Sequence, residues 1–271
     1  MIRRILRAIA VALPFLLALC FPVGPLFPWS PWKPGYATLS LERADVYYPA
    51  GGRLPAAFLD IDSFIRQSEE FHRLKIPNRI RVIVCRNWSD FHRFMPTLGG
   101  VGAATLETGT VIYITPRISE RGLEYGEFLR HEISHATLNQ NQSLLQAHAG
   151  SKAPWFFEGL AVSFGRQKAY VTAREFTVFA MARDLVSVID PAKTRPDLPS
   201  DMRYNYQVWR YFLEHLIDTQ GRDKFQQLMI GMTHDPGGSE RVFQSVYGTA
   251  MPDGIRRFRA DVLSGKWSPR P

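Results

Sequence analysis

The sequence predicts an α+β fold in which a small N-terminal sheet precedes a mainly helical C-terminal part. Two runs rich in β-branched residues, 79–85 and 109–115, have the composition of strands. After residue 120, apolar residues recur mostly at helical spacing, and no proline occurs from 120 to 150. Strands that precede the helices, instead of alternating with them, indicate an α+β arrangement.

The first 35 residues form a region of their own, which we expect to be a signal peptide or a membrane anchor. Arg3, Arg4 and Arg7 precede an uncharged stretch, residues 8–32, whose apolar part ends at Phe21. This part is shorter than the roughly 20 residues of a membrane-spanning helix, and no clear cleavage site follows it. Both a cleaved signal and an uncleaved anchor stay open. In either case the arginines remain in the cytoplasm, so the rest of the chain faces the periplasm or the outside.

Residues 36–264 are expected to form one domain, followed by a tail at 265–271. Cys20 lies in the apolar run and Cys85 is alone, so a hydrophobic core and not a disulfide must stabilise this domain. The net charge is +8, which by itself favours nucleic acid as a partner. Because an exported protein meets little nucleic acid, we expect no such partner, and a solvated or lipid-facing basic surface instead.

The N-terminal half is predicted to contain two strands and one short helix before the first long helix. Residues 79–85 alternate and are β-branched, which is typical of a strand. Residues 90–95 form a short helix candidate. After the glycine-rich residues 99–102, residues 109–115 are predicted to form the second strand.

A five-residue motif, His131-Glu132-Ile133-Ser134-His135, lies in the first long predicted helix, which Ser119 could cap. Residues four apart share one helix face, so both imidazoles can point at one ion. The glutamate between them can hold a water bound to that ion, which makes this motif the minimal equipment of a zinc hydrolase.

Glu158 is the candidate for a third ligand. It lies in an apolar helix that Pro154 can begin and Gly165 can end. A carboxylate among aromatic neighbours is costly to bury unless it is paired or bound to a metal. Two histidines and one glutamate leave a fourth tetrahedral position for water, as in catalytic zinc sites.

Helices are predicted at residues 172–188 and 201–220, with Gly221 ending the second and Pro191, Pro196 and Pro199 marking the loop between them. Four further histidines have no metal-ligand spacing, and we expect them at the surface or half-buried: His72, His92, His148 and His215.

The two motif segments together resemble the gluzincin metallopeptidases, the thermolysin-like and aminopeptidase-like clan, and most closely their small bacterial peptidase-MA-like branch. The resemblance implies a two-lobed zincin-like fold and one zinc ion held by His131, His135 and Glu158, with Glu132 as general base. It also implies that the strand at residues 111–114 binds extended substrate as the edge of the sheet.

In the same branch an active-site tyrosine lies in the segment that resembles residues 206–213. A phenol near the zinc can donate a hydrogen bond to the developing oxyanion. Tyr206 is the first choice for this role, and Tyr204 and His234 are the substitutes.

These features predict a zinc metallopeptidase that hydrolyses a peptide or protein substrate outside the cytoplasm and associates with the membrane through its N-terminal segment. Two alternatives stay open. One is a zinc amidase that acts on cell-wall material. The other is an inactive peptidase-like fold that binds peptides or envelope partners. The latter is favoured by Val162, which stands where related enzymes carry a carboxylate that orients a ligand histidine.

Overall fold

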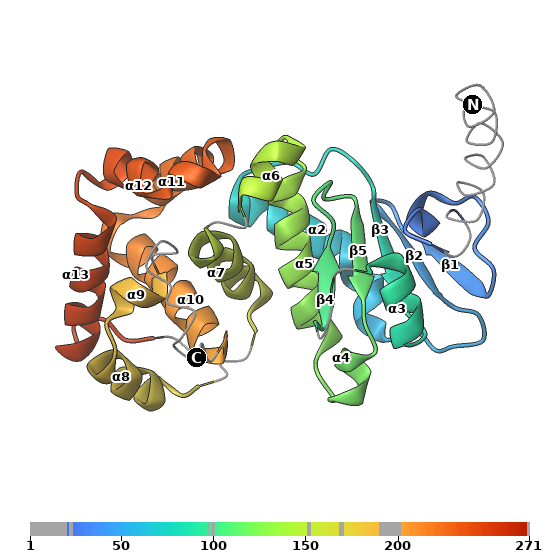
Figure 1. The fold of residues 1–271 in the computed structure, drawn as a ribbon, viewed down its shortest axis with the longest axis horizontal. Coiled ribbons are helices and arrows are strands. Elements are labelled where there is room, and N and C mark those ends of the chain that lie inside the picture. The colour runs from blue at the N-terminus through green and yellow to red at the C-terminus, as the bar shows by residue number, and fades with distance from the viewer. Residues whose placement is uncertain are drawn as a thin grey trace, which may run out of the picture.

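The computed structural model describes residues 21, 24–96, 98, 101–150, 153–167, 171–189 and 202–269, without the side chains of 202 and 203. It is an α+β protein, as predicted: a five-stranded mixed sheet lies on one side and a group of helices on the other (Figure 1). Most of the expected signal or anchor region, the glycines at 99–100 and the three loop prolines lie outside the described residues. Within the described ranges, no helix is long and apolar enough to cross a bilayer.

The sheet has the strand order β1-β2-β3-β5-β4. Its three inner strands are parallel, and both outer strands pair antiparallel with their neighbours. The strands are β1 (Tyr36–Ser40), β2 (Ala44–Pro49), β3 (Ile80–Val84), β4 (Ala103–Thr105) and β5 (Val111–Ile114).

The strand order corrects one expectation. Val111–Ile114 is not the edge of the sheet, because β5 pairs with β3 on one side and with β4 on the other. All four of its residues are fully buried. The edge strand on this side of the sheet is β4, Ala103–Thr105, which follows the glycine-rich segment, and β1 forms the opposite edge.

Helices cover both faces of the sheet, because the strand side chains are apolar on both. Val82, Ile112 and Ile114 pack with α2 (Ile61–His72) and α5 (Tyr125–Asn139). On the other face, Tyr113 packs with Phe27 and with α3 (Trp88–Phe94). Smaller elements beside the sheet are the 3-10 helices η1 (Phe27–Trp29) and η2 (Ala56–Asp60) and the one-turn helix α4 (Arg117–Glu120).

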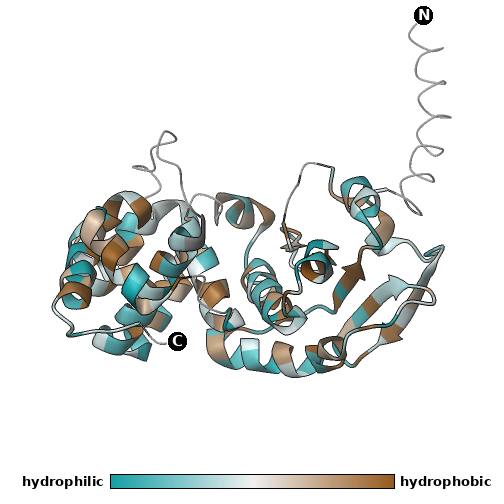
Figure 2. Ribbon diagram, turned by 90° about the horizontal axis from the view of Figure 1, so that it is seen from below, coloured by the Kyte–Doolittle hydropathy of each residue, from teal (hydrophilic) through white to brown (hydrophobic). Residues whose placement is uncertain are grey.

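The helical part has its own core, built around Trp155, Phe212 and Phe258. In Figure 2, brown hydrophobic segments run along the sheet, whereas most helices mix teal and brown, as amphipathic helices do. The helices are α6 (Leu144–Gly150), α7 (Pro154–Gly165), α8 (Ala173–Ala182), α9 (Leu185–Ile189), α10 (Met202–Gln220), α11 (Arg222–His234), α12 (Ser239–Tyr247) and α13 (Met251–Leu263), with the 3-10 helix η4 (Pro236–Gly238).

Some predicted boundaries are wrong. Ser119 does not cap the motif helix: it lies in α4, where its hydroxyl donates to the carbonyl of Pro116. A turn at Gly122, with φ of 61°, separates α4 from α5. The helix expected at residues 172–188 is interrupted after α8, where Arg183 adopts an extended conformation. Trp267, expected in the tail, is buried in the helical core.

Two of the histidines expected near the surface are buried. His72 is fully buried and His215 is 2% exposed, whereas His92 and His148 are exposed as predicted. Each buried imidazole has a polar partner: His72 lies 2.9 Å from the hydroxyl of Ser134, and His215 lies 2.9 Å from the carboxylate of Asp261. Burial of these polar rings therefore depends on partners that are distant in sequence.

Candidate metal centre

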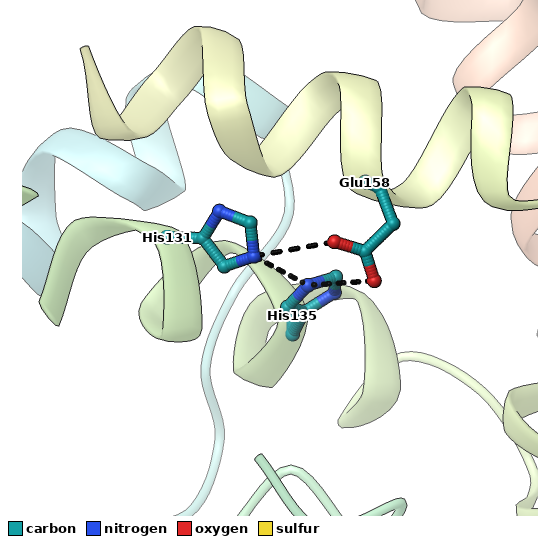
Figure 3. Close-up of side chains that lie close together, drawn as sticks. All are labelled: His131, His135 and Glu158. Atoms are coloured by element: carbon teal, nitrogen blue, oxygen red, sulfur yellow. Dashed lines mark hydrogen bonds and ion pairs between the residues drawn. The ribbon is translucent and has the colours of Figure 1, made fainter. Parts of the chain in front are cut away.

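Two helices meet at the candidate metal centre. α5 carries His131 and His135 one turn apart, and their Nε2 atoms lie 3.1 Å from each other. α7 packs against α5 and brings in Glu158, whose carboxylate oxygens lie 3.3 Å from Nε2 of His131 and 3.6 Å from Nε2 of His135. Figure 3 shows both rings and the carboxylate pointing toward one another.

The donor atoms lie close enough together to bind one metal ion. Ligand atoms about 2.0–2.1 Å from a tetrahedral ion are about 3.3–3.4 Å from each other. The two Nε2 atoms are 3.1 Å apart, and the contacts of 3.3 and 3.6 Å with Glu158 end on different carboxylate oxygens, so they show closeness and not the geometry around one ion. One ligand atom from each of the three residues can be chosen so that all lie within 4.8 Å of one another. The donor set, two imidazoles and one carboxylate, is one that zinc accepts with a position left for water.

The electrostatics of the cluster keep Glu158 charged. Burial penalises its carboxylate, but His135 and His131 beside it hold the pKa of Glu158 well below its usual range. Burial also disfavours a charged His135, yet the adjacent Glu158 carboxylate outweighs this and raises the pKa of His135 to about 9.

The ring nitrogen of His131 that faces away from the cluster, Nδ1, has no hydrogen bond with a described residue that would orient the ring. This nitrogen is also buried. Val162, fully buried, contributes no polar group. Ser163 does not serve as a substitute, because its hydroxyl donates to Oε1 of Glu214 over 3.2 Å.

Glu132, the candidate base, is 5% exposed and is held by a residue from the sheet. The hydroxyl of Thr105 donates to its Oε2 over 2.7 Å and also lies 3.0 Å from its backbone oxygen. Thr105 is the last residue of β4, so the edge strand orients the carboxylate of the motif helix. Sequence reasoning missed Thr105, because a threonine after a glycine-rich stretch carries no signal for such a contact.

A cleft of about 810 Å³ contains the cluster. Its lining includes Glu132 and all three candidate ligands, residues of β4, and Tyr206 from α10. The two substitutes for Tyr206 are not part of it. Tyr204 stacks on Phe179, with ring centroids 4.5 Å apart, and His234 is exposed at the end of α11.

No protein-family model matches the chain. A comparison with curated proteins finds no significant relative. What supports a function is therefore the arrangement of the chain's own residues in this cleft.

Proposed function

We propose that this protein is a zinc-dependent peptidase of gluzincin type, with one zinc ion per chain held by His131, His135 and Glu158. The main observation behind the proposal is that one ligand atom from each of these residues can be chosen so that all lie within 4.8 Å of one another, with a buried glutamate beside them in one cleft. In this proposal the sheet part with α5 and the helical part are the two lobes of a zincin-like fold.

A bound zinc ion would supply Lewis acidity, which would lower the pKa of a water molecule and polarise a substrate carbonyl. Glu132 would accept a proton from the attacking water as the oxygen of that water adds to the carbonyl carbon. Thr105 keeps the carboxylate of Glu132 in place through its 2.7 Å hydrogen bond. Tyr206 donates a hydrogen bond to the negative charge that develops on the carbonyl oxygen. When the C–N bond breaks, Glu132 passes the proton to the leaving amine.

The substrate in this proposal is a peptide or protein segment in extended conformation. Within the described part of the chain β4 ends the sheet, so one side of its backbone is not paired with another described strand. Ala103, Ala104 and Thr105 all line the cleft. An extended peptide can add to such an edge through main-chain hydrogen bonds. β4 therefore takes the role that the sequence suggested for residues 111–114.

We further propose that the N-terminal segment anchors the protein in the cell membrane or exports it, with the peptidase part in the periplasm or outside. The basic start and apolar run of residues 1–21 support this proposal. Nucleic acid is not among the proposed partners.

Metal content and turnover, measured on the full chain in detergent, test the proposal. Wild type is expected to hold one zinc, measured by mass spectrometry, and Glu158→Ala is expected to lose most of it. Glu132→Gln should retain zinc, but its rate of peptide cleavage should fall at least a hundredfold, because the substitution removes the proton acceptor. Glu107→Gln is a matched control, since this carboxylate lines the cleft but pairs with exposed His148.

The alternative of an inactive peptide-binding fold is favoured by His131, whose Nδ1 has no hydrogen-bond partner among the described residues. A ligand histidine without a hydrogen bond at its outer nitrogen binds metal less tightly. If wild type holds no zinc even after zinc is supplied, the metallopeptidase proposal fails and an inactive peptide-binding fold is left. If wild type holds zinc but cleaves only wall-derived amides in a panel that also contains peptides, the amidase alternative replaces it.

A further inference from the structure

Two arginines at one end of the cleft have no partner among the residues that the structure describes. Arg117 and Arg121 both line it, from α4 and the residue that ends this helix. Among the described residues, neither side chain takes part in a hydrogen bond or an ion pair. The neighbouring acid, Glu120, accepts instead from the indole of Trp88 at 3.2 Å.

The three carboxylates that line the cleft are, by contrast, all engaged. Glu107 lies 3.0 Å from His148. Glu132 accepts from Thr105, and Glu158 contacts the histidine pair. The cleft thus offers two positive charges that none of its own carboxylates neutralises.

Backbone pairing shows where these arginines lie along the cleft. Ala103, the first residue of β4, pairs with Ile114, the last residue of β5. α4 follows β5 almost directly, so Arg117 lies near the beginning of β4, and α4 lies at that end of both strands in Figure 1. Thr105, the last residue of β4, lies at Glu132. The arginine end is therefore displaced from the candidate metal centre along the direction of the edge strand.

We propose that Arg117 and Arg121 form a subsite that binds a carboxylate of the substrate, a proposal that rests on the proposed peptidase function. An arginine guanidinium binds a carboxylate with two parallel hydrogen bonds, and two arginines four residues apart can bind one carboxylate jointly. Leu123 and Phe128 line the same cleft, so an apolar substrate residue fits beside the acidic group.

The direction of β4 specifies which side of the scissile bond carries this carboxylate. An antiparallel strand is the more stable partner for an edge. A substrate antiparallel to β4 passes Thr105 first and then the start of β4, so the residues at the arginines are C-terminal to the bond cleaved. The carboxylate comes either from an aspartate or glutamate side chain there or from the free C-terminus of the peptide.

Four labelled peptides separate these sources, with zinc-loaded Glu132→Gln protein as the binding partner. One pair is Ala-Ala-Phe-Leu-Glu-Ala amide and its glutamine counterpart. The other pair is Ala-Ala-Phe-Leu-Ala with a free C-terminus and the same peptide as an amide. Fluorescence anisotropy gives the dissociation constant of each. The zinc content of the same sample shows whether the metal site is formed.

At least one carboxylate peptide is expected to bind about tenfold more tightly than its neutral partner, the size of one charge-assisted interaction. Adding Arg117→Gln and Arg121→Gln should abolish that difference. The control, Arg53→Gln with Arg66→Gln, removes the same charge from exposed residues outside the cleft and should leave the difference unchanged.

A preference for the glutamate peptide identifies a side-chain carboxylate, and a preference for the free C-terminus identifies a terminal one. Equal affinity within both pairs, no binding of any peptide, or a preference that survives loss of both arginines overturns the subsite. If the protein holds zinc and cleaves peptides yet shows one of these results, only the subsite proposal fails. If the protein holds no zinc, the peptidase proposal fails, and the comparison of the four peptides still tests whether the arginines bind a carboxylate.

Discussion

At the scale of single residues, helix geometry alone explains why the two histidines of the candidate site share one face, but it does not explain how Glu132 is oriented. His131 and His135 face the same way because they are four residues apart on a helix. Glu132 lies between them, but its orientation depends on the hydroxyl of Thr105, which belongs to the edge strand. The general base of the proposed mechanism is thus positioned by a different element from the one that carries it.

Replacing Thr105 tests this positioning. Thr105→Val keeps the shape of the side chain and removes the hydrogen bond to Glu132. We expect kcat for peptide cleavage to fall by roughly tenfold to a hundredfold, because a misoriented base loses much of the benefit of general base catalysis. Zinc content and KM should change little. Steady-state kinetics on the zinc-loaded protein measures both constants.

Thr105→Ser is the control for this experiment, since it retains a hydroxyl and should keep most of the wild-type kcat. Equal kcat values for the valine variant and wild type would show that the 2.7 Å contact does not orient the base.

At the scale of elements, the packing of α7 decides where Glu158 lies. α7 packs between α5 and α10, the two helices that it contacts most extensively. The residue after Glu158 is Gly159, and a methyl group there would lie 2.8 Å from the backbone carbon of Trp209 on α10. Glycine at this position lets α7 and α10 approach closely, and α7 is the helix that carries Glu158 to the histidines of α5.

Gly159→Ala should therefore separate α7 from α10. We expect the free energy of unfolding to fall by about 1–3 kcal/mol, the usual cost of an added group in a packed interface. We also expect weaker zinc binding, because the displaced helix carries Glu158. Urea unfolding measures the first effect, and competition with a chelator measures the second.

Gly126→Ala in α5 is the matched control. A methyl group there meets its nearest neighbours at 3.9 Å, which is ordinary contact. It should leave stability unchanged or slightly raise it through better helix propensity. A Gly159 variant that resembles the Gly126 variant in both measurements would refute the role of this close approach.

Among the elements of the sheet part, the motif helix, β3 and β5 were predicted, whereas β1, β2, β4 and the amphipathic helix α2 were not. The periodic motif helix and the β-branched strands β3 and β5 lie close to where the sequence indicates them. β4 has only three residues, two of them alanine, so no alternation distinguishes it from a loop. Which strand forms the edge was predicted wrongly, because the residue pattern of β5 is the same whether or not another strand covers it.

At the scale of the whole molecule, a buried polar network joins the motif helix to the rest of the protein. Nδ1 of His72, at the end of α2, lies 2.8 Å from the carbonyl of Ser68, and its Nε2 lies 2.9 Å from the hydroxyl of Ser134 in the motif. Gln226 of α11 donates to the carbonyl of His72 over 3.3 Å. The network thus connects the sheet part, the motif helix and the helical part.

Burial of His72 within this network makes stability depend on pH. Burial lowers the pKa of His72 to about 4, whereas an unfolded chain binds the proton near its ordinary value of about 6.5. Between these values the unfolded state binds the proton and the folded state does not. The free energy of unfolding therefore falls as pH drops from about 6.5 to about 4, by up to about 3 kcal/mol, and His72 has no effect on its slope above this window.

Urea unfolding of wild type and His72→Gln across pH 4–8, in the presence of a chelator, measures this contribution. The comparison is needed because carboxylates with lowered pKa, such as Asp90, also reduce stability as pH falls. The gap between the two proteins should narrow as the pH falls through the window. Parallel curves would show that the ring of His72 titrates at the same pH in the folded and unfolded states.

The sequence by itself determined the features that depend on short separations along the chain. These are the helix around the motif, the shared face of His131 and His135, and the proline that begins α7; the left-handed residue that ends α7 is Arg166 and not Gly165. Each follows from helix geometry and from backbone restrictions of single residues, which act within a few positions.

Only the tertiary structure decided the contacts between distant segments. It brings Glu158 to the histidines and Thr105 to Glu132, and it puts Tyr206, but neither Tyr204 nor His234, in the cleft. It also buries His72 and His215. The physical reason is that periodicity shows which side of an element is covered, whereas the identity of the covering residue depends on how whole elements pack.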